Sequence, residues 1–373
     1  MHVAFDPQTF SLQRYGGISR YFFETALRLA ALPDTRVSIL AFAHINAYLA
    51  AASAAAVGFR LPLLPEPLRP LLVRANQALA RRWLARNGAD LVHETYYSHA
   101  RTAPAGVPTV VTVHDMIHEK FPDYAPRTRK IAMAKRAAIG RADHVICVSE
   151  NTRHDLVDIY GIDPSRTTVV RHGFSFRFSE TAAVHRPLGE PYVLFIGKRG
   201  GYKNFEALAR AYAQLSGLAR EHLLVCFGDA PFSRRERDFL RRLGIPLDRV
   251  RHFAGGDDRL AAFYRHAAVF VYPSRYEGFG MPPLEAMACD CPVVCSNAAS
   301  LPEVVGDAAI AFDPGDVQAL AAAIGAVLES PDTALRLRQA GRARLARFSW
   351  ERCAQQTRAV YARVLAQRQT RTG

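Results

Sequence analysis

The sequence predicts an α/β protein built from two doubly wound domains, each with a parallel sheet between layers of helices. Three observations support this prediction. Short apolar runs alternate with longer helical patterns, this alternation lapses once near the middle, and a second alternating series follows. A length of 373 residues is enough for two domains, and 49% hydrophobic residues can supply a core for each.

Six short runs in the first half are nearly continuous in apolar residues, which is typical of strands buried on both faces of a parallel sheet. The expected strands are HVAFD (2–6), VSILAFA (37–43), LVHETY (91–96), PTVVTVHD (108–115), HVICVS (144–149) and TTVVRHG (167–173). Helices fall between them, most clearly over residues 20–32 and 150–161.

Residues 176–191 carry charge, glycine and proline without periodicity, so we expect a linker there, with the domain boundary between residues 180 and 181. The second series of expected strands is YVLFIG (192–197), HLLVCFG (222–228), VRHFAG (250–255), VFVYPS (269–274), PVVCSN (292–297) and AAIAFDP (308–314). The chain then ends in one long helix from residue 349.

The stretch SRYEGFGMPPLEA (274–286) joins a predicted strand to a helix and carries two carboxylates, Glu277 and Glu285. Pro282 and Pro283 suit a first helical turn, where a missing N–H costs nothing. A glycine loop at a helix N-terminus directs backbone N–H groups at one point, which favours an anion such as phosphate. We expect a ligand in a cleft between the two halves, at the carboxyl ends of their strands.

The net charge of +14 is unusually basic, with 48 Lys and Arg against 34 Asp and Glu. Two segments, 59–86 and 127–141, mix apolar residues with arginine and lysine, which favours docking on an anionic membrane surface. An arginine-rich composition without any such role is the alternative. We expect no nucleic-acid partner, because no helix-turn-helix or combined aromatic and basic recognition module is present.

The six cysteines sit in apolar contexts rather than in a disulfide pattern, which indicates a reducing compartment. The cluster Cys289, Cys291 and Cys295 lacks a second pair of metal ligands, so we expect no metal there. Met1 leads directly into a strand, and no apolar run approaches the roughly 20 residues of a membrane span. The expected location is cytoplasmic, with peripheral association at the inner face of the plasma membrane as an addition.

Six motifs in order make the sequence resemble the retaining glycosyltransferases of family 4 (group 1), particularly bacterial mannosyltransferases of surface-polysaccharide assembly. The motifs are RYGGISRYFFETALRLA from residue 14, TVHDM (112–116), CVSENTRHDL (147–156), FIGKRGGYKN (195–204), EGFGMPPLEAMACDCPVV (277–294) and LPEVVGDAAIAFDP (301–314). The resemblance implies the GT-B fold: two Rossmann-like domains facing across a cleft. Residues 1–180 would form the acceptor domain, residues 181–348 the donor domain, and the C-terminal helix (349–373) would cross back to the first domain.

The resemblance assigns roles to the E-x7-E pattern. Glu277 would contact the transferred sugar, and Glu285 would accept hydrogen bonds from the ribose hydroxyls of the nucleotide. Between them, the backbone N–H groups of Gly278, Phe279 and Gly280 would face sugar hydroxyls and phosphate.

A basic loop, GKRGGYKN, follows the strand that ends at Gly197. The resemblance implies that a basic pair on this loop grips the donor diphosphate, and we assign Arg199 and Lys203 to it. In the commonest family form an arginine directly follows the strand-end glycine, so Lys198 is the alternative partner.

In the first half, Gly16 and Gly17 open a backbone pocket at a helix N-terminus that suits donor phosphate or acceptor, although such a pair is also an ordinary turn. His114 and Asp115 end a strand at the rim where ligands bind in such sheets. The resemblance implies that His114 meets the donor sugar. His172 is a further candidate for lining the cleft.

The implied reaction moves a sugar from a nucleotide-sugar donor to a growing polysaccharide or a lipid-pyrophosphate-linked glycan, with retention of anomeric configuration. Mannose from GDP-mannose is the first expectation, and a UDP-, dTDP- or GDP-deoxysugar is the alternative. We expect no cofactor and no metal, because GGDDR (255–259) resembles an ordinary loop before a helix. A nucleotide-sugar epimerase or hydrolase remains a competing function, whereas a dehydrogenase is disfavoured because G-x-G-x-x-G is absent.

Overall fold

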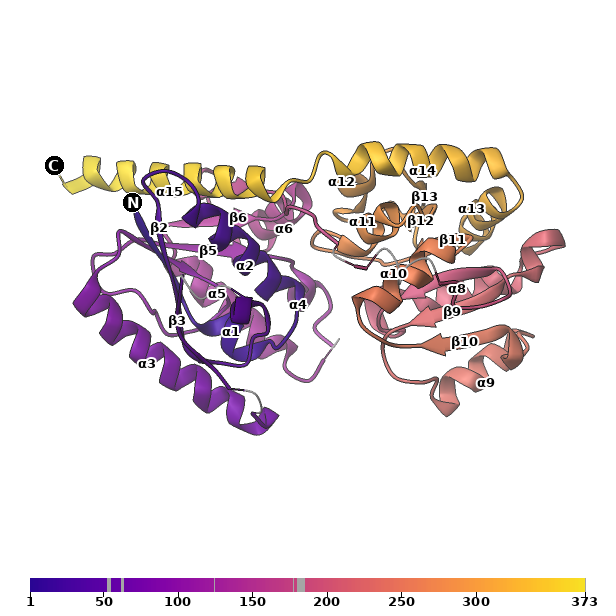
Figure 1. Cartoon of the computed structure of the whole chain (residues 1–373), viewed down its shortest axis with the longest axis horizontal. Coiled ribbons are helices and arrows are strands. Elements are labelled where there is room, and N and C mark those ends of the chain that lie inside the picture. The colour runs from indigo at the N-terminus through magenta and orange to yellow at the C-terminus, as the bar shows by residue number, and fades with distance from the viewer. Residues whose placement is uncertain (52–54, 62–63, 124, 177, 180–184, 373) are drawn as a thin grey trace. The chain divides into compact units, whose positions relative to one another are not determined.

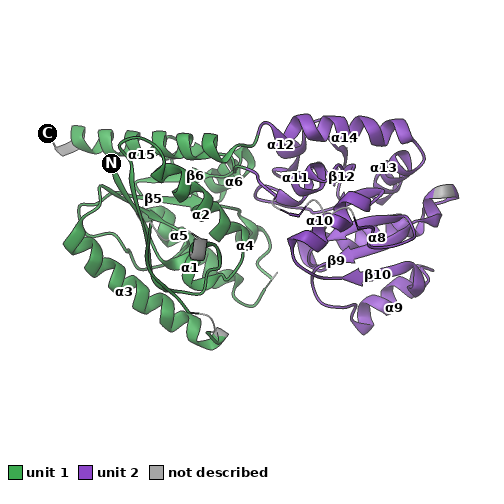
Figure 2. Ribbon diagram, in the orientation of Figure 1, with its two compact units in different colours: residues 1–173, 348–373 green, residues 174–347 purple. Residues whose placement is uncertain are grey.

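The computed structural model describes residues 1–51, 55–61, 64–123, 125–176, 178–179 and 185–372. These residues form two compact units (Figure 2). Unit 1 comprises Met1–Gly173 and Phe348–Gly373, and unit 2 comprises Phe174–Arg347. The boundary expected between residues 180 and 181 lies outside the described residues.

Unit 1 contains a seven-stranded parallel sheet within the described part of the chain, in the order β3-β2-β1-β4-β5-β6-β7. The strands are β1 (His2–Phe5), β2 (Arg36–His44), β3 (Ala56–Arg60), β4 (Leu91–Glu94), β5 (Thr109–Val113), β6 (His144–Cys147) and β7 (Thr167–Val169). The helices between them are α1 (Gln8–Leu12), α2 (Gly17–Ala30), α3 (Arg69–Asn87), α4 (Ile117–Lys120), α5 (Thr128–Arg141) and α6 (Glu150–Tyr160).

The C-terminal helix α15 (Trp350–Thr372) belongs to unit 1 and lies along α2 (Figure 1). Trp350 and Tyr361 share a hydrophobic core cluster with Phe22 of α2. Arg28 Nε donates a hydrogen bond of 2.7 Å to Glu351 Oε1. The approach is so close at Gly173 that a Cβ there would lie 2.4 Å from the Cα of Trp350. The expected return of the last helix to the first domain is confirmed.

Unit 2 contains a six-stranded parallel sheet among its described residues, in the order β10-β9-β8-β11-β12-β13. The strands are β8 (Tyr192–Ile196), β9 (Leu223–Phe227), β10 (Val250–Phe253), β11 (Val269–Tyr272), β12 (Val293–Ser296) and β13 (Ile310–Phe312). The helices are α8 (Phe205–Ala213), α9 (Arg234–Arg242), α10 (Asp257–His266), α11 (Met281–Ala288), α12 (Leu301–Val305), α13 (Val317–Leu328) and α14 (Pro331–Leu345).

All twelve strands expected from the sequence are present, and both sheets have the strand order of a doubly wound fold. The sequence pattern missed β3, which pairs with β2 at the edge of the first sheet. Gly58 interrupts its short apolar run and has a φ of 139°, and a Cβ there would lie 2.0 Å from the Ala41 carbonyl oxygen. A close backbone approach of this kind requires glycine.

Candidate active site

In unit 2 the strand order reverses between β8 and β11, and the loops that leave these two strands lie against each other. The backbone N–H of Arg275 donates to the Tyr202 carbonyl oxygen at 2.8 Å. The side-chain amide of Asn204 donates to the Pro273 carbonyl oxygen at 3.1 Å. Asn204 has a φ of 59°, a left-handed conformation that asparagine tolerates better than most residues. These bonds join the basic loop to the E-x7-E loop at a topological switch point.

Two predicted site residues meet here. Lys203 Nζ lies 2.8 Å from Glu277 Oε1 and donates to the Tyr272 hydroxyl, also at 2.8 Å. Glu277 is only 8% exposed, so its charge is largely withdrawn from water and requires this counter-charge. Burial, followed by the nearby Glu277 carboxylate, raises the pKa of Tyr272 well above its ordinary value, so its hydroxyl stays protonated.

Hydrogen bonds from Ser300 fix the backbone of the E-x7-E loop. Its hydroxyl lies 2.9 Å from the Glu277 carbonyl oxygen and 2.8 Å from that of Phe279. Gly280 precedes α11 with a φ of 105°, and a Cβ there would lie 2.7 Å from a Leu301 methyl group. Glycine is therefore required at this position. Gly278, which lies between Glu277 and Phe279, is buried as they are.

Glu285 lies within α11 and is half-buried. The Tyr264 hydroxyl is 3.2 Å from Glu285 Oε2 and 3.2 Å from the Pro282 carbonyl oxygen. Burial and the Glu285 carboxylate raise the pKa of Tyr264 well above its ordinary value, so this phenol is a donor to the carboxylate. The hydroxyl thus fixes one oxygen of Glu285.

The assignment of Arg199 to the donor diphosphate stays a prediction, and the structure shows which protein groups hold its guanidinium. Its side chain is buried, with Nε 2.7 Å from Glu236 Oε1 and Nη2 2.7 Å from the Ala230 carbonyl oxygen, and it stacks over the Phe232 ring at 4.3 Å. Although partial burial opposes it, the Arg199 hydrogen bond lowers the pKa of Glu236. Arg199 thus anchors the loop to α9, while Lys198, next to it, is exposed.

In unit 1, His114 follows β5 at the carboxyl edge of the sheet. It is 7% exposed, and neither ring nitrogen has a hydrogen-bond partner among the described residues. Its ring lies 5.6 Å from that of His172 and 5.1 Å from that of Tyr21. Burial, then the neighbouring His172, lowers the pKa of His114 well below its ordinary value, and burial lowers that of His172 to about 3. Both ring nitrogens are therefore available for a hydrogen bond to a ligand or to water.

Asp115, the neighbour of His114, is half-buried and forms hydrogen bonds within unit 1. Its carbonyl oxygen accepts a hydrogen bond from Lys135 Nζ at 2.8 Å, and its carboxylate accepts one from the Ile117 N–H at 3.0 Å. Lys135 is fully buried and also pairs with Glu119 at 2.8 Å. Asp115 therefore shapes the loop behind His114.

Gly16, one of the two glycines expected to open a backbone pocket, also has a structural role. A Cβ on Gly16 would lie 2.3 Å from Gln13 Oε1, which accepts a hydrogen bond from the Ser19 N–H and so caps α2. Gly17 is exposed, and a Cβ there would meet nothing within 4 Å. Gly16 is thus required for the cap, whereas Gly17 leaves the helix N-terminus open.

Sequence reasoning missed three residues that shape these sites: Tyr272, Asn204 and Ser300. Tyr272 had a visible signal, since a tyrosine at the last position of an apolar strand places a polar group at the ligand edge of the sheet. Asn204 and Ser300 act on backbone groups distant in sequence, and their residue types carry no comparable signal. Within the described ranges, no three His, Cys, Asp or Glu side chains form a group that could hold a metal ion.

Comparison with known proteins agrees with this architecture. Residues 15–177 match the model of Glycosyltransferase Family 4, and residues 177–344 match that of Glycosyl transferases group 1. The O-antigen chain mannosyltransferase B of Escherichia coli is 33% identical over 79% of this chain and 80% of its own length. The chain belongs to the family 4, group 1 glycosyltransferases. The MMP alpha-(1->4)-mannosyltransferase of Mycolicibacterium hassiacum is 32% identical over 81% of this glycosyltransferase and 76% of its own length.

Solved structures show the same fold for this glycosyltransferase. The sucrose-phosphate synthase of Thermosynechococcus elongatus superposes with a TM-score of 0.74 over 98% of this chain and 99% of its own, at 22% identity. The two parallel α/β units and the returning C-terminal helix are thus those of a GT-B glycosyltransferase.

Proposed function

We propose that this glycosyltransferase transfers mannose from GDP-mannose to a glycan or lipid-diphosphate-linked glycan, with retention of configuration. The observation that carries the proposal is the Lys203–Glu277 pair at the switch point of unit 2, 2.8 Å apart, on a sheet edge where nucleotides bind in doubly wound folds. The choice of mannose is supported by two relatives that are themselves mannosyltransferases.

In this proposal the donor is held by unit 2. Glu285, with one oxygen fixed by Tyr264, accepts hydrogen bonds from the ribose diol. Lys198 and Lys203 face the diphosphate, whose charge grows as the sugar leaves, so cations here stabilise the transition state more than the ground state. The basic loop supplies this charge in place of a metal ion, and we propose that the reaction needs neither metal nor cofactor.

Glu277 contacts the hydroxyls of the transferred sugar, and it stabilises the positive charge that develops at the anomeric carbon. The bond from that carbon to the diphosphate breaks, the acceptor oxygen attacks from the same face, and the departing phosphate takes the acceptor proton. His114 is neutral because its pKa is lowered, so it offers one N–H donor and one acceptor nitrogen to the sugar.

Exposed basic residues of α3 support a second proposal, that unit 1 associates with a membrane surface. On α3, Leu71 is 59% and Leu79 is 45% exposed, and Arg81, Arg82 and Arg86 are exposed as well. Exposed leucine beside arginine favours an anionic bilayer surface. Among the described residues, no helix has the length and apolar character to cross a membrane.

The test of the function is a thermal-shift panel of GDP-, UDP- and dTDP-sugars, followed by product analysis with the donor that stabilises the protein. The proposal expects stabilisation by GDP-mannose above the others and release of GDP with an α-mannosylated product. Conversion of the donor to its epimer, without transfer of the sugar to an acceptor, would instead establish the competing epimerase function.

A further inference from the structure

A cavity of about 450 Å³ lies in unit 1, beside the segments that follow β1 and β4 at the carboxyl edge of the sheet. This volume suits a small ligand. Its lining includes Thr9, Leu12, Tyr96, Tyr97, Arg127 and Lys130. Thr9, Leu12 and the two tyrosines were not candidates from the sequence, whereas Arg127 and Lys130 lie in the basic segment 127–141 that was expected to dock on a membrane.

One end of the cavity is positively charged. Arg127 precedes the first residue of α5, and Lys130 lies in its first turn. That turn contains no acidic residue, and the side chain of its N-cap residue, Arg127, makes no capping hydrogen bond. Within the described ranges, neither Arg127 nor Lys130 forms an ion pair, and both are exposed. Two cations at the positive end of a 14-residue helix favour an anion.

The remaining wall is aromatic and apolar. The rings of Tyr96 and Tyr97 lie 4.8 Å apart, and both line the cavity with Leu12. Burial raises the pKa of Tyr96 to about 12, so its hydroxyl remains a neutral hydrogen-bonding group at physiological pH. Tyrosines combine an apolar ring with a polar tip, and the C–H faces and hydroxyls of a sugar match this combination.

Thr9 supplies a second, independent indication of a ligand. It is fully buried, it lines the cavity, and its Oγ1 has no hydrogen-bond partner among the described residues. A buried hydroxyl without a partner is unfavourable in the free protein. A ligand hydroxyl or phosphate oxygen in the cavity would satisfy it.

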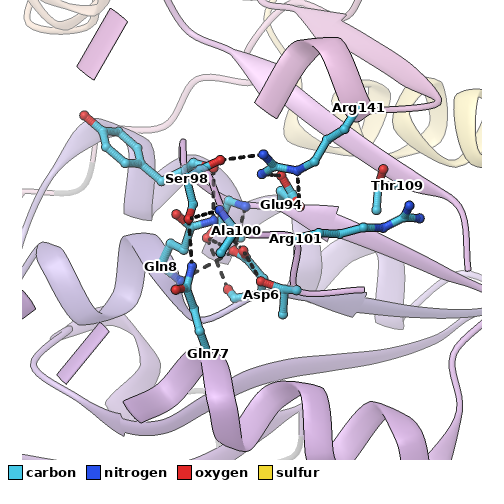
Figure 3. A network of polar contacts seen from close by, with 12 residues as sticks. Asp6, Gln8, Gln77, Glu94, Ser98, Ala100, Arg101, Thr109 and Arg141 are labelled. Carbon is cyan, nitrogen blue, oxygen red and sulfur yellow. Dashed lines mark hydrogen bonds and ion pairs between the residues drawn. The ribbon is translucent and has the colours of Figure 1, made fainter. Parts of the chain in front are cut away.

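The walls are held in place by a buried network around Asp6, seen in Figure 3. Asp6 accepts hydrogen bonds from the Thr95 N–H at 2.8 Å and from Gln8 Nε2 at 2.6 Å. Gln8 Nε2 also lies 3.1 Å from the Tyr96 carbonyl oxygen, and Thr95 Oγ1 accepts the Thr9 N–H at 3.1 Å. The cavity is therefore pre-organised, which lowers the cost of binding.

We propose that this cavity binds a phosphorylated sugar of the acceptor. Its phosphate lies at Arg127, Lys130 and the N-terminus of α5, its ring lies against Tyr96 and Tyr97, and one oxygen bonds to Thr9. This inference rests on the proposed function, because it names the acceptor class of that reaction. The phosphate belongs either to a free glycosyl phosphate or to a lipid-linked glycan.

The test measures binding to the full-length protein by ligand-observed NMR titration. The probes are mannose 1-phosphate, methyl α-mannoside and mannosyl phosphoryl decanol. R127Q/K130Q should weaken binding of mannose 1-phosphate about tenfold or more, since hydrogen bonds between charged groups are lost. The control variant R129Q/R136Q removes the same charge from the same helix without touching the cavity, and it should bind as the parent does.

The Thr9→Val variant separates a binding role from a structural one. Because Thr9 Oγ1 has no partner in the free protein, T9V should keep the parent's thermal unfolding midpoint while it binds mannose 1-phosphate several-fold more weakly. Equal binding by parent and T9V, together with equal binding by parent and R127Q/K130Q, would overturn the proposal. So would methyl α-mannoside binding as tightly as mannose 1-phosphate.

The lipid-bearing probe distinguishes the sources of the phosphate. Comparable affinity for mannose 1-phosphate and mannosyl phosphoryl decanol supports recognition of the head group alone, and tighter binding of the latter supports a lipid-linked acceptor. GDP-mannose binding is measured on the same samples. If the parent protein binds mannose 1-phosphate but does not bind GDP-mannose or another nucleotide-sugar, the proposed function is contradicted and the cavity assignment still stands.

Discussion

Lys203 Nζ and Glu277 Oε1 lie 2.8 Å apart although the two residues are 74 positions apart in the sequence. The basic loop and the E-x7-E loop thus present one ion pair, with Tyr272 as a third partner 2.8 Å from Lys203. Because the pair is nearly buried, each charge fixes the position of the other. The Glu277 carboxylate and the Lys203 ammonium are therefore already in position when the donor binds, so little reorganisation is needed during the reaction.

Changing Glu285 to Ala should raise the donor KM about tenfold or more and leave kcat nearly unchanged. The ribose contact is the same in the ground and transition states, so its loss weakens binding uniformly. Hydrogen bonds to a charged group contribute about 1.5–3 kcal/mol, which sets this size. Steady-state kinetics with varied donor checks it, and a fall in kcat at constant KM would contradict the ribose assignment.

Arg199 and Lys198 should respond oppositely to substitution. R199M removes one partner of a mostly buried ion pair and should lower the free energy of unfolding by about 2 kcal/mol. K198Q should leave stability unchanged and weaken donor binding, because Lys198 is exposed. Urea unfolding followed by circular dichroism and donor titration measure both. An R199M protein of normal stability with weakened donor binding would instead assign Arg199 to the diphosphate site.

Unit 1 should lose stability as pH falls below about 6.5. Burial lowers the pKa of His93 to about 3. Between that value and about 6.5, His93 is therefore protonated in the unfolded chain but neutral in the folded unit. Between pH 7 and 5 this single group should lower the free energy of unfolding by about 2 kcal/mol. Both tryptophans of the chain, Trp83 and Trp350, belong to unit 1, so their fluorescence reports its unfolding.

The variant H93Q tests this origin of the pH dependence. His93 bonds Tyr361 and Thr112, and glutamine can hydrogen-bond but does not titrate. The loss of stability between pH 7 and 5 should therefore be smaller in H93Q than in the parent, whatever their difference at pH 7. An identical pH dependence in the two proteins would show that His93 is not the group responsible.

Changing Arg81, Arg82 and Arg86 together to Gln should lower co-sedimentation with acidic liposomes at low salt by more than about tenfold, since each basic residue near such a surface contributes about 1 kcal/mol. Donor hydrolysis in solution should persist. The control changes three exposed arginines of unit 2, Arg234, Arg235 and Arg242, to Gln. Equal sedimentation of parent, test and control proteins would make this part of α3 an ordinary solvated face.

The fold was predictable from sequence because its strands are contiguous apolar runs whose pattern is local. The site was predictable only as a set of loops. Arg199 and Lys203 share one loop, yet one is turned to Glu236 on α9 and the other to Glu277. Side-chain direction depends on partners elsewhere in the chain, which residue type and spacing do not encode. Thr9 gave no signal for the same reason, since its significance is a missing partner.

The central claim is that the Lys203–Glu277 site acts on a nucleotide-sugar, and the most direct test is the rate of nucleoside diphosphate release by the parent and by E277Q. Glutamine keeps the shape of the side chain and a hydrogen-bond acceptor for Lys203. E277Q should lower kcat about a hundredfold, with donor affinity within a few-fold of the parent. Near-normal turnover by E277Q with the donor that the parent uses would contradict this claim.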